Sequence, residues 1–523
     1  MCEPQCMSES VGAASSMATT FFGVLMASYC NISNPNIWPD DYGQEALENG
    51  LDSFDFVVPG LLDSISGDKF TYPYLTEKSP NYCLAYNNGS CLWPRGKMIG
   101  GSGGIHVMTY LRGNKGDFDS FKEEGCDGWG WNDVLPYYKK SLEIVDDVGL
   151  VVTHFEYKYP LAKVILDAAR ERGQPFVRDY IETNHDAHTF AWVNAGYGRR
   201  MSTGKVYLSA VKDRTNLKVI KYAQATKINF EGNRAKFVTF LYKDEHEMTV
   251  PVSKEVVVSA GSIDSPKLLM LSGIGPKDEL EKFRIPVVQN LPVGYNLHDH
   301  VSVFLFFKIS KSATKEDLPL EYFFQYLKNS SGPLSSNGIF NNNGFKTTNR
   351  KEKYPNKYAV FAVLMCAMRP ISKGRIKLRS GSYKDDPIII PNYLDQEYDL
   401  KTLIEGIKFQ VAFERSPTFR KYEGSFVKLN IPECDKMRYK SDNYWKCYAK
   451  YMTNTIYHPL GTNKMGRIDD DTTVLDPRLR VKGIQGLRVI DTSIFPHMVT
   501  ANTYGPTVMA AEKGSDMIIE DWN

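Results

Sequence analysis

At 523 residues the chain is too long for one simple core and is suited to two closely joined domains. Its apolar content of 42% and charged content of 24% are ordinary for a globular protein. The formal net charge of +2 gives no overall field that would attract nucleic acid or an anionic membrane, and no stretch approaches the roughly 18 apolar residues of a membrane span. Nucleic-acid binding and membrane insertion are therefore not expected, and small-molecule chemistry stays open.

Residues 1–50 are predicted to form a leader. The stretch at 17–30, MATTFFGVLMASYC, has the length and the small-residue ending of the apolar region of a secretory signal. The segment before it carries Glu3 and Glu9 and lacks the basic residues that such a signal needs. We expect an extracellular protein, with a cytoplasmic location as the alternative if this stretch is not a signal.

Four segments have the character of strands in an α/β sheet: 54–58, 217–228, 255–259 and 486–490. The third is uniformly apolar and precedes a helix predicted from Ser265 to Leu271, with Ser265 as the N-cap and Pro266 at the first helical position. The fourth leads to a final helix predicted at about 507–519. Because these strands lie early, in the middle and at the end, their sheet must be assembled from discontinuous pieces.

The stretch between the third and fourth strands differs in composition and in hydrophobic pattern. Residues 308–345 are aromatic and punctuated by Gly, Ser and Asn, residues 358–368 resemble a strand, and residues 400–413 form an amphipathic helical pattern. We predict that 301–451 is mainly a second, substrate-binding domain, and that 51–300 and 452–523 together form the cofactor domain.

The nine cysteines include no CxxC pair, which argues against a zinc ribbon or a thioredoxin-type site. Cys83 and Cys91 bracket a turn-rich stretch, and Cys434 and Cys447 bracket a short polar loop. Both spacings suit local disulfides in an oxidising compartment. The odd total keeps free, partly buried thiols as the alternative.

The first motif block, PRGKMIGGSGGIHVMTYLRGNKGDFDSF at 94–121, has five glycines between Gly96 and Gly104. Such a run permits left-handed backbone angles and lets the main chain approach a bulky ligand closely. A glycine run that leads into a helix also presents free N–H groups to an anion or a ring carbonyl. The alternative is a flexible surface loop, which would not need the ordered apolar residues on both sides.

The second block, GSIDSPKLLMLSGIG at 261–275, follows the predicted buried strand. This order places helix N–H groups beside the carboxyl edge of the sheet, where cofactors sit in open α/β folds. The nearby run GYNLHDH at 294–300 contains His298 and His300. Because no third ligand lies near them, we interpret these two histidines as structural rather than as a metal site.

The third block contains YHPLGTNKMG at 457–466, GLRVIDTSIFP at 486–496 and the triplet ANT at 501–503. Oxidation of an alcohol needs a base for the hydroxyl proton, and histidine titrates near neutral pH. A lone histidine is usually structural, and His458, beside the conformationally fixed Pro459, is the candidate if such a base is present.

Together these blocks resemble the signatures of the glucose-methanol-choline (GMC) oxidoreductases, from about Leu51 to Trp522. The resemblance implies a mixed α/β fold, with a discontinuous, doubly wound FAD-binding domain and a second domain built on an antiparallel sheet. It implies that His458 accepts the proton of an alcohol, sugar or sterol, that Asn502 holds the oxygen, and that hydride passes to the flavin. Oxygen or another acceptor would then take the electrons. The residues that the resemblance places at the FAD are Met98, Gly100, Gly101, Ser102, His106, Val107, Met108, Thr109, Ala225, Asp491 and Ala501.

Some positions depart from the family's pattern. His106 stands where the family usually has Asn, so it is expected either to keep a hydrogen bond to the flavin or to alter the flavin contact. Ile105 occupies the position at which some members attach the flavin covalently through a histidine, so covalent attachment by that route is not expected. The C-terminal run GPTVMAAEKGSDMIIEDW is similar to insect members, including glucose-dehydrogenase-like and ecdysone-oxidase-like enzymes.

The phosphate loop of a dinucleotide fold is missing from this sequence. Such a fold needs a strand, GxGxxG, a helix, a second strand and an acidic residue, whereas here Val58 is followed directly by PGLL. In the family a run like VPGLL comes after the second strand, so roughly forty residues are predicted to be excised near Val58. Because a phosphate site and a central strand are lost, we predict that this chain binds FAD poorly or not at all, as an alternatively spliced or mispredicted product would.

Two other functions are compatible with parts of the sequence. A non-catalytic relative would bind a ligand or a partner through the substrate domain without FAD. A nicotinamide-dependent dehydrogenase is disfavoured because the sequence has no nucleotide fingerprint and its specific signatures are those of flavin enzymes.

Overall fold

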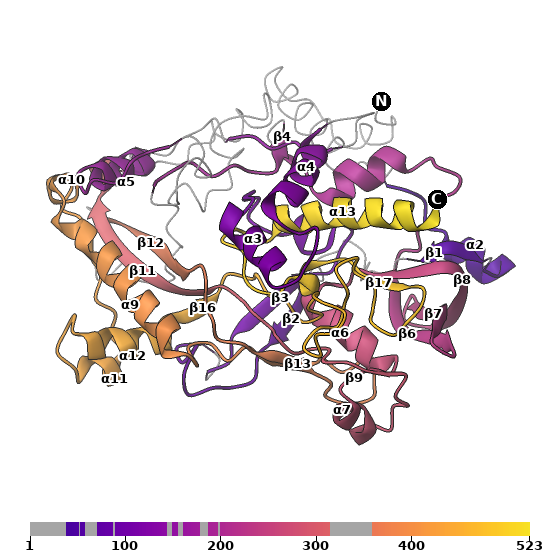
Figure 1. Cartoon of the computed structure of the whole chain (residues 1–523). Helices are drawn as coiled ribbons and strands as arrows, with labels where there is room; N and C mark the ends of the chain where they lie inside the picture. Colours follow the sequence, from indigo (N-terminus) through magenta and orange to yellow (C-terminus); the bar gives the residue numbers. More distant parts are fainter. Residues whose placement is uncertain are drawn as a thin grey trace, which may run out of the picture.

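The computed structural model describes residues 38–51, 53–57, 71–86, 89–143, 149–154, 160–177, 187–196, 199–313 and 358–523. The possible signal at 17–30 and most of the aromatic segment at 308–345 lie outside these ranges. The described residues confirm a mixed fold of helices with two main sheets, which lie on opposite sides of the molecule in Figure 1. The domain boundaries at 300 and 451 stay predictions.

The first sheet joins chain segments that are distant in sequence. Its centre is β8 (His246–Val258), which pairs in parallel with β1 (Phe54–Val57) and with β17 (Leu487–Val489). Val256 of β8 is aligned with Val57 on one side and with Leu487 on the other. The predicted discontinuous assembly is therefore confirmed, because early, middle and late strands share one sheet.

An antiparallel meander extends the same sheet. It consists of β6 (Ala223–Glu231) and β7 (Arg234–Tyr242), which pairs with the first half of β8. The strand predicted at 217–228 therefore begins later, at Ala223, and continues to Glu231. The chain before it bonds elsewhere: the carbonyl of Val219 accepts from the Tyr42 N–H at 2.9 Å.

Helix α6 (Gly261–Leu271) begins four residues earlier than predicted. Ser265 and Pro266 lie inside it, so their assignment as N-cap and first helical residue is wrong. The Asp491 carboxylate accepts a hydrogen bond from the Gly261 N–H at 2.9 Å, which satisfies a donor of the first turn from a distant strand end. A contact 230 residues away in sequence thus sets the start of the helix, and local capping rules cannot detect it.

The second sheet is antiparallel, as predicted. It contains β11 (Val301–Ser310), β12 (Tyr358–Ala367), β15 (Ser425–Phe426) and β16 (Thr453–Thr455). Alternate residues of β11 are buried on one face: Val303, Leu305, Phe307 and Ile309. Helix α9 (Glu397–Val411), predicted at 400–413, lies against this sheet together with α12 (Asp442–Met452), at the left of Figure 1.

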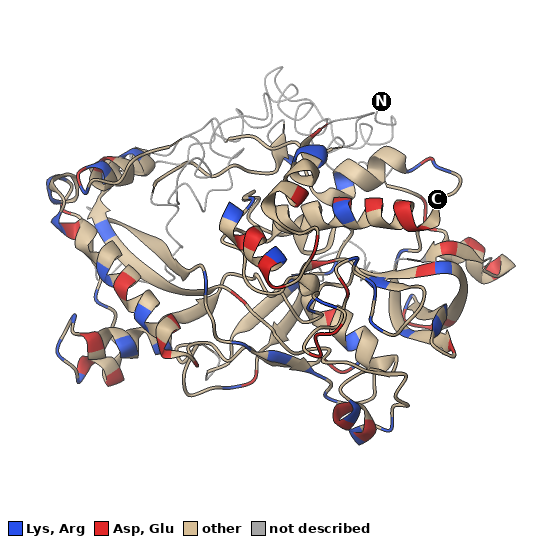
Figure 2. Cartoon of the chain, viewed as in Figure 1, with Lys and Arg blue, Asp and Glu red and all other residues tan. Residues whose placement is uncertain are grey.

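The last helix, α13 (Tyr504–Trp522), starts three residues before the predicted position and packs beside α4 (Trp131–Leu142) (Figure 1). Basic and acidic residues are interspersed along α3 (Lys115–Glu123), α9 and α13 in Figure 2. Among the described residues, no helix combines the length and apolarity that a bilayer crossing requires.

The other elements are α2 (Gly43–Asn49), β2 (Thr71–Leu75), β3 (Leu92–Gly96), η4 (Gly101–Gly104), α5 (Pro160–Arg170), β4 (Ala195–Gly196), β5 (Arg199–Arg200), η6 (Gly204–Leu208), η7 (Ser209–Val211), β9 (Ile274–Gly275), α7 (Lys277–Lys282), β10 (Gln289–Asn290), η8 (Lys311–Ala313), β13 (Arg375–Lys377), β14 (Ile388–Ile390), η10 (Ala412–Arg415), α10 (Pro417–Lys421), α11 (Pro432–Asp435) and η11 (Thr492–Ile494).

Two disulfides tie down local loops. Cys83 bonds to Cys91 and Cys434 bonds to Cys447, so both spacings recognised in the sequence correspond to pairs. Cys126 and Cys366 are free thiols within the described residues. Each disulfide closes a short loop, across 8 and 13 residues respectively, and so restricts the unfolded chain locally.

A buried ion pair connects β8, β17 and α13. The Arg488 side chain, 1% exposed, donates to Glu255 from Nε at 2.6 Å and from Nη2 at 3.0 Å, and it also pairs with Asp521. Trp522 Nε1 donates to the same Glu255 carboxylate at 2.8 Å. The charges are therefore paired and hydrogen-bonded, as buried charges must be.

Replacing Arg488 by Met should lower the free energy of unfolding by about 3–5 kcal/mol, because the Glu255 carboxylate would stay buried without its cation. Urea unfolding followed by circular dichroism measures this loss. The matched control is Arg379→Met, which breaks a half-exposed pair with Glu77 and should cost less than about 1 kcal/mol. Equal losses in the two variants would contradict the assignment.

Candidate active site

The loop that carries His458 leaves the second sheet directly after β16. Tyr457 adopts a left-handed φ of 68°, and its carbonyl accepts a hydrogen bond from Arg95 Nη1 at 2.9 Å. The main-chain N–H of His458 donates to Asp299 Oδ1 at 2.9 Å. The main chain at His458 is therefore held in place by the end of β16, by the Arg95 side chain of β3 and by the buried carboxylate of Asp299.

Asp299 is the anchor of this loop. Its Oδ2 accepts hydrogen bonds from the hydroxyl groups of Thr455, at 2.6 Å, and of Tyr393. Burial raises the pKa of Asp299 to about 6, against the opposing effect of these donors. The carboxylate thus binds the backbone of His458 and leaves the imidazole ring to other partners.

The imidazole of His458 lies between two side chains. Its Nε2 is 3.2 Å from Asn502 Nδ2, and its Nδ1 is 2.8 Å from His300 Nδ1. Burial is the largest cause that holds the pKa of His458 well below its usual range, and His300, Arg95 and His106 lower it further. The sequence prediction that His458 and Asn502 come together is confirmed as geometry, whereas the prediction that His300 is merely structural overlooked its contact with His458.

The loop that carries Asn502 is held by Asp117 of α3. The buried Asp117 Oδ2 accepts from the Thr500 N–H at 2.8 Å and from its hydroxyl at 2.6 Å, while Oδ1 pairs with Arg369. The same carboxylate closes the capping box of α3 through Asn114. Asn502 is thereby positioned relative to the first helix after the glycine block, a relation that the sequence motifs did not reveal.

The glycine block forms a tight turn after β3. Gly100 and Gly101 have φ angles of 88° and 53°, and the Gly101 N–H donates to the Met98 carbonyl at 2.8 Å. The Ser102 hydroxyl accepts from the Gly96 N–H at 3.1 Å. These left-handed angles favour glycine, and no heavy atom lies within 4 Å of where a Cβ of Gly101 would stand.

The block continues toward the two catalytic candidates. The His106 ring stacks on the ring of Tyr504, with 4.4 Å between the ring centroids. Tyr504 follows Asn502 by two residues. After Val107, Met108 has a left-handed φ of 63°, and Thr109 bridges to Val193. Buried Ala501 directly precedes Asn502, so this end of the predicted cofactor residues meets the catalytic pair.

Two orphaned polar atoms show that this end fits a flavin. His106 Nε2 and Thr109 Oγ1 are buried and have no hydrogen-bond partner among the residues that the structure describes. Burial lowers the pKa of His106 to about 3, so its ring is neutral and can donate or accept. Buried polar atoms are normally paired, and the heteroatoms of an isoalloxazine ring would supply such partners.

Asp491 and Ala225, which are also predicted to bind the cofactor, lie apart from this end of the site. The Asp491 carboxylate is used by the protein itself: it accepts from the Gly261 N–H and, at 2.5 Å, from the Ser265 hydroxyl. Ala225 lies on β6, paired with Phe240, and is not brought to the catalytic pair by any described contact. A cavity of about 260 Å³ nevertheless links its neighbourhood to the glycine block, since Gln224 and Lys97 both line it.

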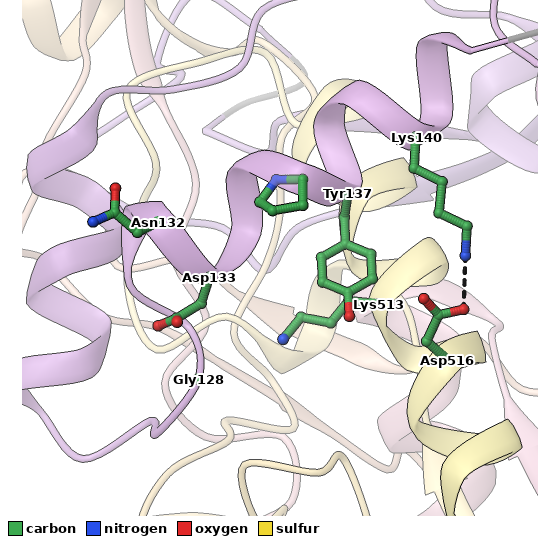
Figure 3. A pocket seen from close by; sticks show the side chains of 8 residues that line it. Gly128, Asn132, Asp133, Tyr137, Lys140, Lys513 and Asp516 are labelled. Carbon is green, nitrogen blue, oxygen red and sulfur yellow. Dashed lines mark hydrogen bonds and ion pairs between the residues drawn. The ribbon is translucent and has the colours of Figure 1, made fainter.

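A larger groove of about 500 Å³ lies between α4 and α13 (Figure 3). It is lined by Asp133 and Tyr137 on α4 and by Lys513 and Asp516 on α13, and Lys140 pairs with Asp516 at 2.7 Å. Along a helix that rises 1.5 Å per residue, Lys513 stands more than 10 Å beyond Tyr504. This groove is therefore separate from the site around His458.

The comparisons with known proteins agree with this geometry. Two family models described as GMC oxidoreductase match residues 9–302 and 370–511. The chain is 35% identical to a glucose dehydrogenase [FAD, quinone] of Drosophila melanogaster, over 89% of this chain and 80% of that protein. It is 34% identical to an alcohol dehydrogenase [acceptor] of Pseudomonas putida, over 83% of each. A crystal structure of formate oxidase, 22% identical, superposes with a TM-score of 0.76 over 90% of this chain and 99% of the other.

The chain belongs to the GMC oxidoreductase family. Its homologues are FAD-dependent oxidoreductases that act on alcohols or sugars with an electron acceptor. The resemblance found in the motifs is therefore confirmed at the level of family, fold and cofactor class.

The stability of the site should depend on pH because four histidines are held in a neutral form: His298, His300 and His458, which are buried, and His106, which is partly buried. Unfolded histidines bind protons near pH 6.5, whereas burial lowers the folded pKa values, to about 3 for His298 and about 4 for His300. Lowering the pH below about 6.5 therefore favours the unfolded chain. Asp264 and Asp299, with pKa values raised to about 6, bind protons preferentially in the folded chain and partly offset this loss.

We therefore expect the free energy of unfolding to fall by a few kcal/mol between pH 7 and pH 5 at constant ionic strength. Urea unfolding at several pH values measures it, and a His298→Asn variant should lose part of the dependence. A free energy of unfolding that rises over this range would contradict the buried neutral histidines.

Proposed function

We propose that the site oxidises the CH–OH group of an alcohol or sugar, with His458 as the base for the hydroxyl proton. The observation that carries this proposal is the distance of 3.2 Å between His458 Nε2 and Asn502 Nδ2, which brings the carboxamide beside the Nε2 edge of the imidazole. A neutral imidazole can accept the proton, and the carboxamide can hold the oxygen while charge develops on it. The buried setting excludes water from this step.

FAD, when bound, supplies the acceptor for the hydride of the carbinol carbon. His106 and Thr109 would meet the ring through their orphaned atoms, and Gly100 and Gly101 would allow the cofactor to approach the main chain. Ser102, by contrast, already accepts a bond from Gly96 and supports the turn itself. The substrate would then lie between the ring and the two side chains of His458 and Asn502.

A sugar is the first substrate to test, because glucose dehydrogenases of Drosophila are among the most similar relatives. The acceptor of the electrons is proposed to be a quinone-like compound or oxygen. An extracellular location is supported by the two disulfides, since such bonds persist in oxidising compartments. Detection of the intact chain in the medium of expressing cells tests that location, and retention inside the cells would contradict it.

We also propose that the internal deletion near Val58 weakens the phosphate end of the FAD site. Strand β1, which should be central in a doubly wound sheet, pairs only with β8 among the described residues, and the Phe56 side chain is 36% exposed. The alignment with the Drosophila melanogaster enzyme runs over 507 residues but covers only 89% of the 523 residues of this chain. The part of this chain that is aligned is therefore shorter than the alignment itself. The relative has residues at aligned positions where this chain has gaps, as an internal deletion predicts.

The purified chain should carry much less than one FAD per molecule, because the helix N-terminus that faces the diphosphate is missing. Absorbance in the flavin bands against protein concentration measures the occupancy. Inserting after Val57 a strand–GxGxxG–helix–strand segment of the kind that a dinucleotide fold uses should restore a full complement of FAD. Full occupancy of the uninserted chain would refute the proposed defect.

In the chain with this segment inserted and FAD bound, His458→Ala should slow flavin reduction by an alcohol about 10²–10⁴-fold, through loss of the base. Asn502→Ala should slow it about 10²–10³-fold, through loss of a donor to the substrate oxygen. Anaerobic stopped-flow spectroscopy measures both rates. The matched control is His246→Ala, at an exposed histidine. A His458 variant in which the flavin is reduced as fast as in this control would contradict the proposed mechanism.

A further inference from the structure

The two buried histidines His300 and His458 meet nitrogen to nitrogen. Their Nδ1 atoms are 2.8 Å apart, and the side chains lie in a region where His300 is 0% and His458 is 8% exposed. A hydrogen bond between two ring nitrogens needs one N–H donor and one lone pair. Since a neutral imidazole has one of each, the contact alone leaves the direction of the bond open.

The other nitrogen of His300 decides the direction. His300 Nε2 is 3.1 Å from the carbonyl oxygen of Met368, which can only accept, and the backbone of Val499 also hydrogen-bonds the ring. The proton of His300 therefore resides on Nε2, and burial, which lowers the pKa of His300 to about 4, keeps the ring from carrying a second one near neutral pH. His300 Nδ1 is left with a lone pair, so His458 Nδ1 must be the donor.

We propose that His300 is a positioning residue that fixes His458 in the tautomer with its proton on Nδ1. The Nε2 lone pair of His458 then faces the Asn502 amide group, which donates to it at 3.2 Å. A substrate hydroxyl that lies beside Asn502 would meet this same lone pair. The inference deepens the proposed function, because it explains which nitrogen of His458 can act as the base.

The alternative partner for this role is Asp299, and the contacts exclude it. The carboxylate bonds the main-chain N–H of His458 at 2.9 Å and two hydroxyl groups, and it makes no described contact with the imidazole. The backbone and the ring of His458 are therefore held by different residues. Loss of His300 would free the ring to exchange its proton between Nδ1 and Nε2 while Asp299 still held the loop.

The proton transfer balances without another group. When the substrate O–H bond breaks, its proton forms a new N–H bond at His458 Nε2, and the ring becomes an imidazolium. Its Nδ1–H then donates a charge-assisted hydrogen bond to the neutral His300, which stabilises the cation. The proton stays on Nε2, and His300 neither gains nor loses one.

The tautomer can be read directly in the protein as purified, with or without FAD. Nitrogen-15 NMR of histidine-labelled protein distinguishes a protonated ring nitrogen from one with a lone pair, and loss of signals in His458→Gln assigns the ring. The wild type should show His458 with Nδ1 protonated and Nε2 unprotonated. His300→Leu should shift the ring to a mixture of tautomers, whereas His300→Asn, whose side-chain oxygen can accept from Nδ1, should restore the wild-type signals.

His298→Leu is the matched control, because His298 is buried two residues away and bonds Asn296 rather than His458. It should leave the His458 signals unchanged. A wild-type ring with its proton on Nε2, or a folded His300→Leu protein with an unchanged tautomer, would overturn the inference. If His300→Leu does not fold, the wild-type spectrum and His300→Asn still decide. A correct tautomer together with full activity of His458→Ala would refute the proposed function and leave this inference intact.

Discussion

A buried imidazole can take a proton from an alcohol only while it is uncharged and turned with its free nitrogen toward the substrate. The fold meets both conditions at His458. Desolvation holds its pKa well below the ordinary value, His300 binds its Nδ1, and its Nε2 faces the Asn502 amide group, which a substrate hydroxyl would displace from that nitrogen. A lowered pKa makes the ring a weaker base, so the site must favour the transfer through the stabilisation of the charges that form. The partners of the ring are therefore as important as the ring itself.

These partners come from parts of the chain that are far apart in sequence. His300 precedes β11, the His458 loop leaves β16, and both strands pair in the second sheet. Asn502 lies two residues before the start of α13, whose far end is connected to the first sheet by the ion pair of Arg488 with Glu255 and Asp521. Because Asn502 leads into α13, its position relative to His458 depends on how this long helix packs beside α4 and against the first sheet. A surface change far from the site can thus alter the distance between the two side chains.

Much of this was predictable from the sequence, and the reasons are local. His458 and Asn502 lie in motifs whose order and spacing are specific, and the strands at 54–58 and 255–259 have apolar patterns that predict them. The start of α6 was not predictable, because Asp491 sets it across 230 residues. The same holds for His300: in sequence it is one of two close histidines, and only the fold shows that one contacts His458 while the other bonds Asn296. Local patterns predict elements well and tertiary partners poorly.

The central claim is that an alcohol binds between the imidazole of His458 and the amide group of Asn502. The most direct test is a crystal structure of the FAD-loaded protein, with the missing segment inserted after Val57, and a bound alcohol that reacts too slowly to be consumed. We predict that its hydroxyl oxygen lies within hydrogen-bond distance, about 2.7–3.2 Å, of both His458 Nε2 and Asn502 Nδ2. Density for the alcohol elsewhere, such as the groove between α4 and α13, with these two side chains turned away from the flavin, would contradict the account.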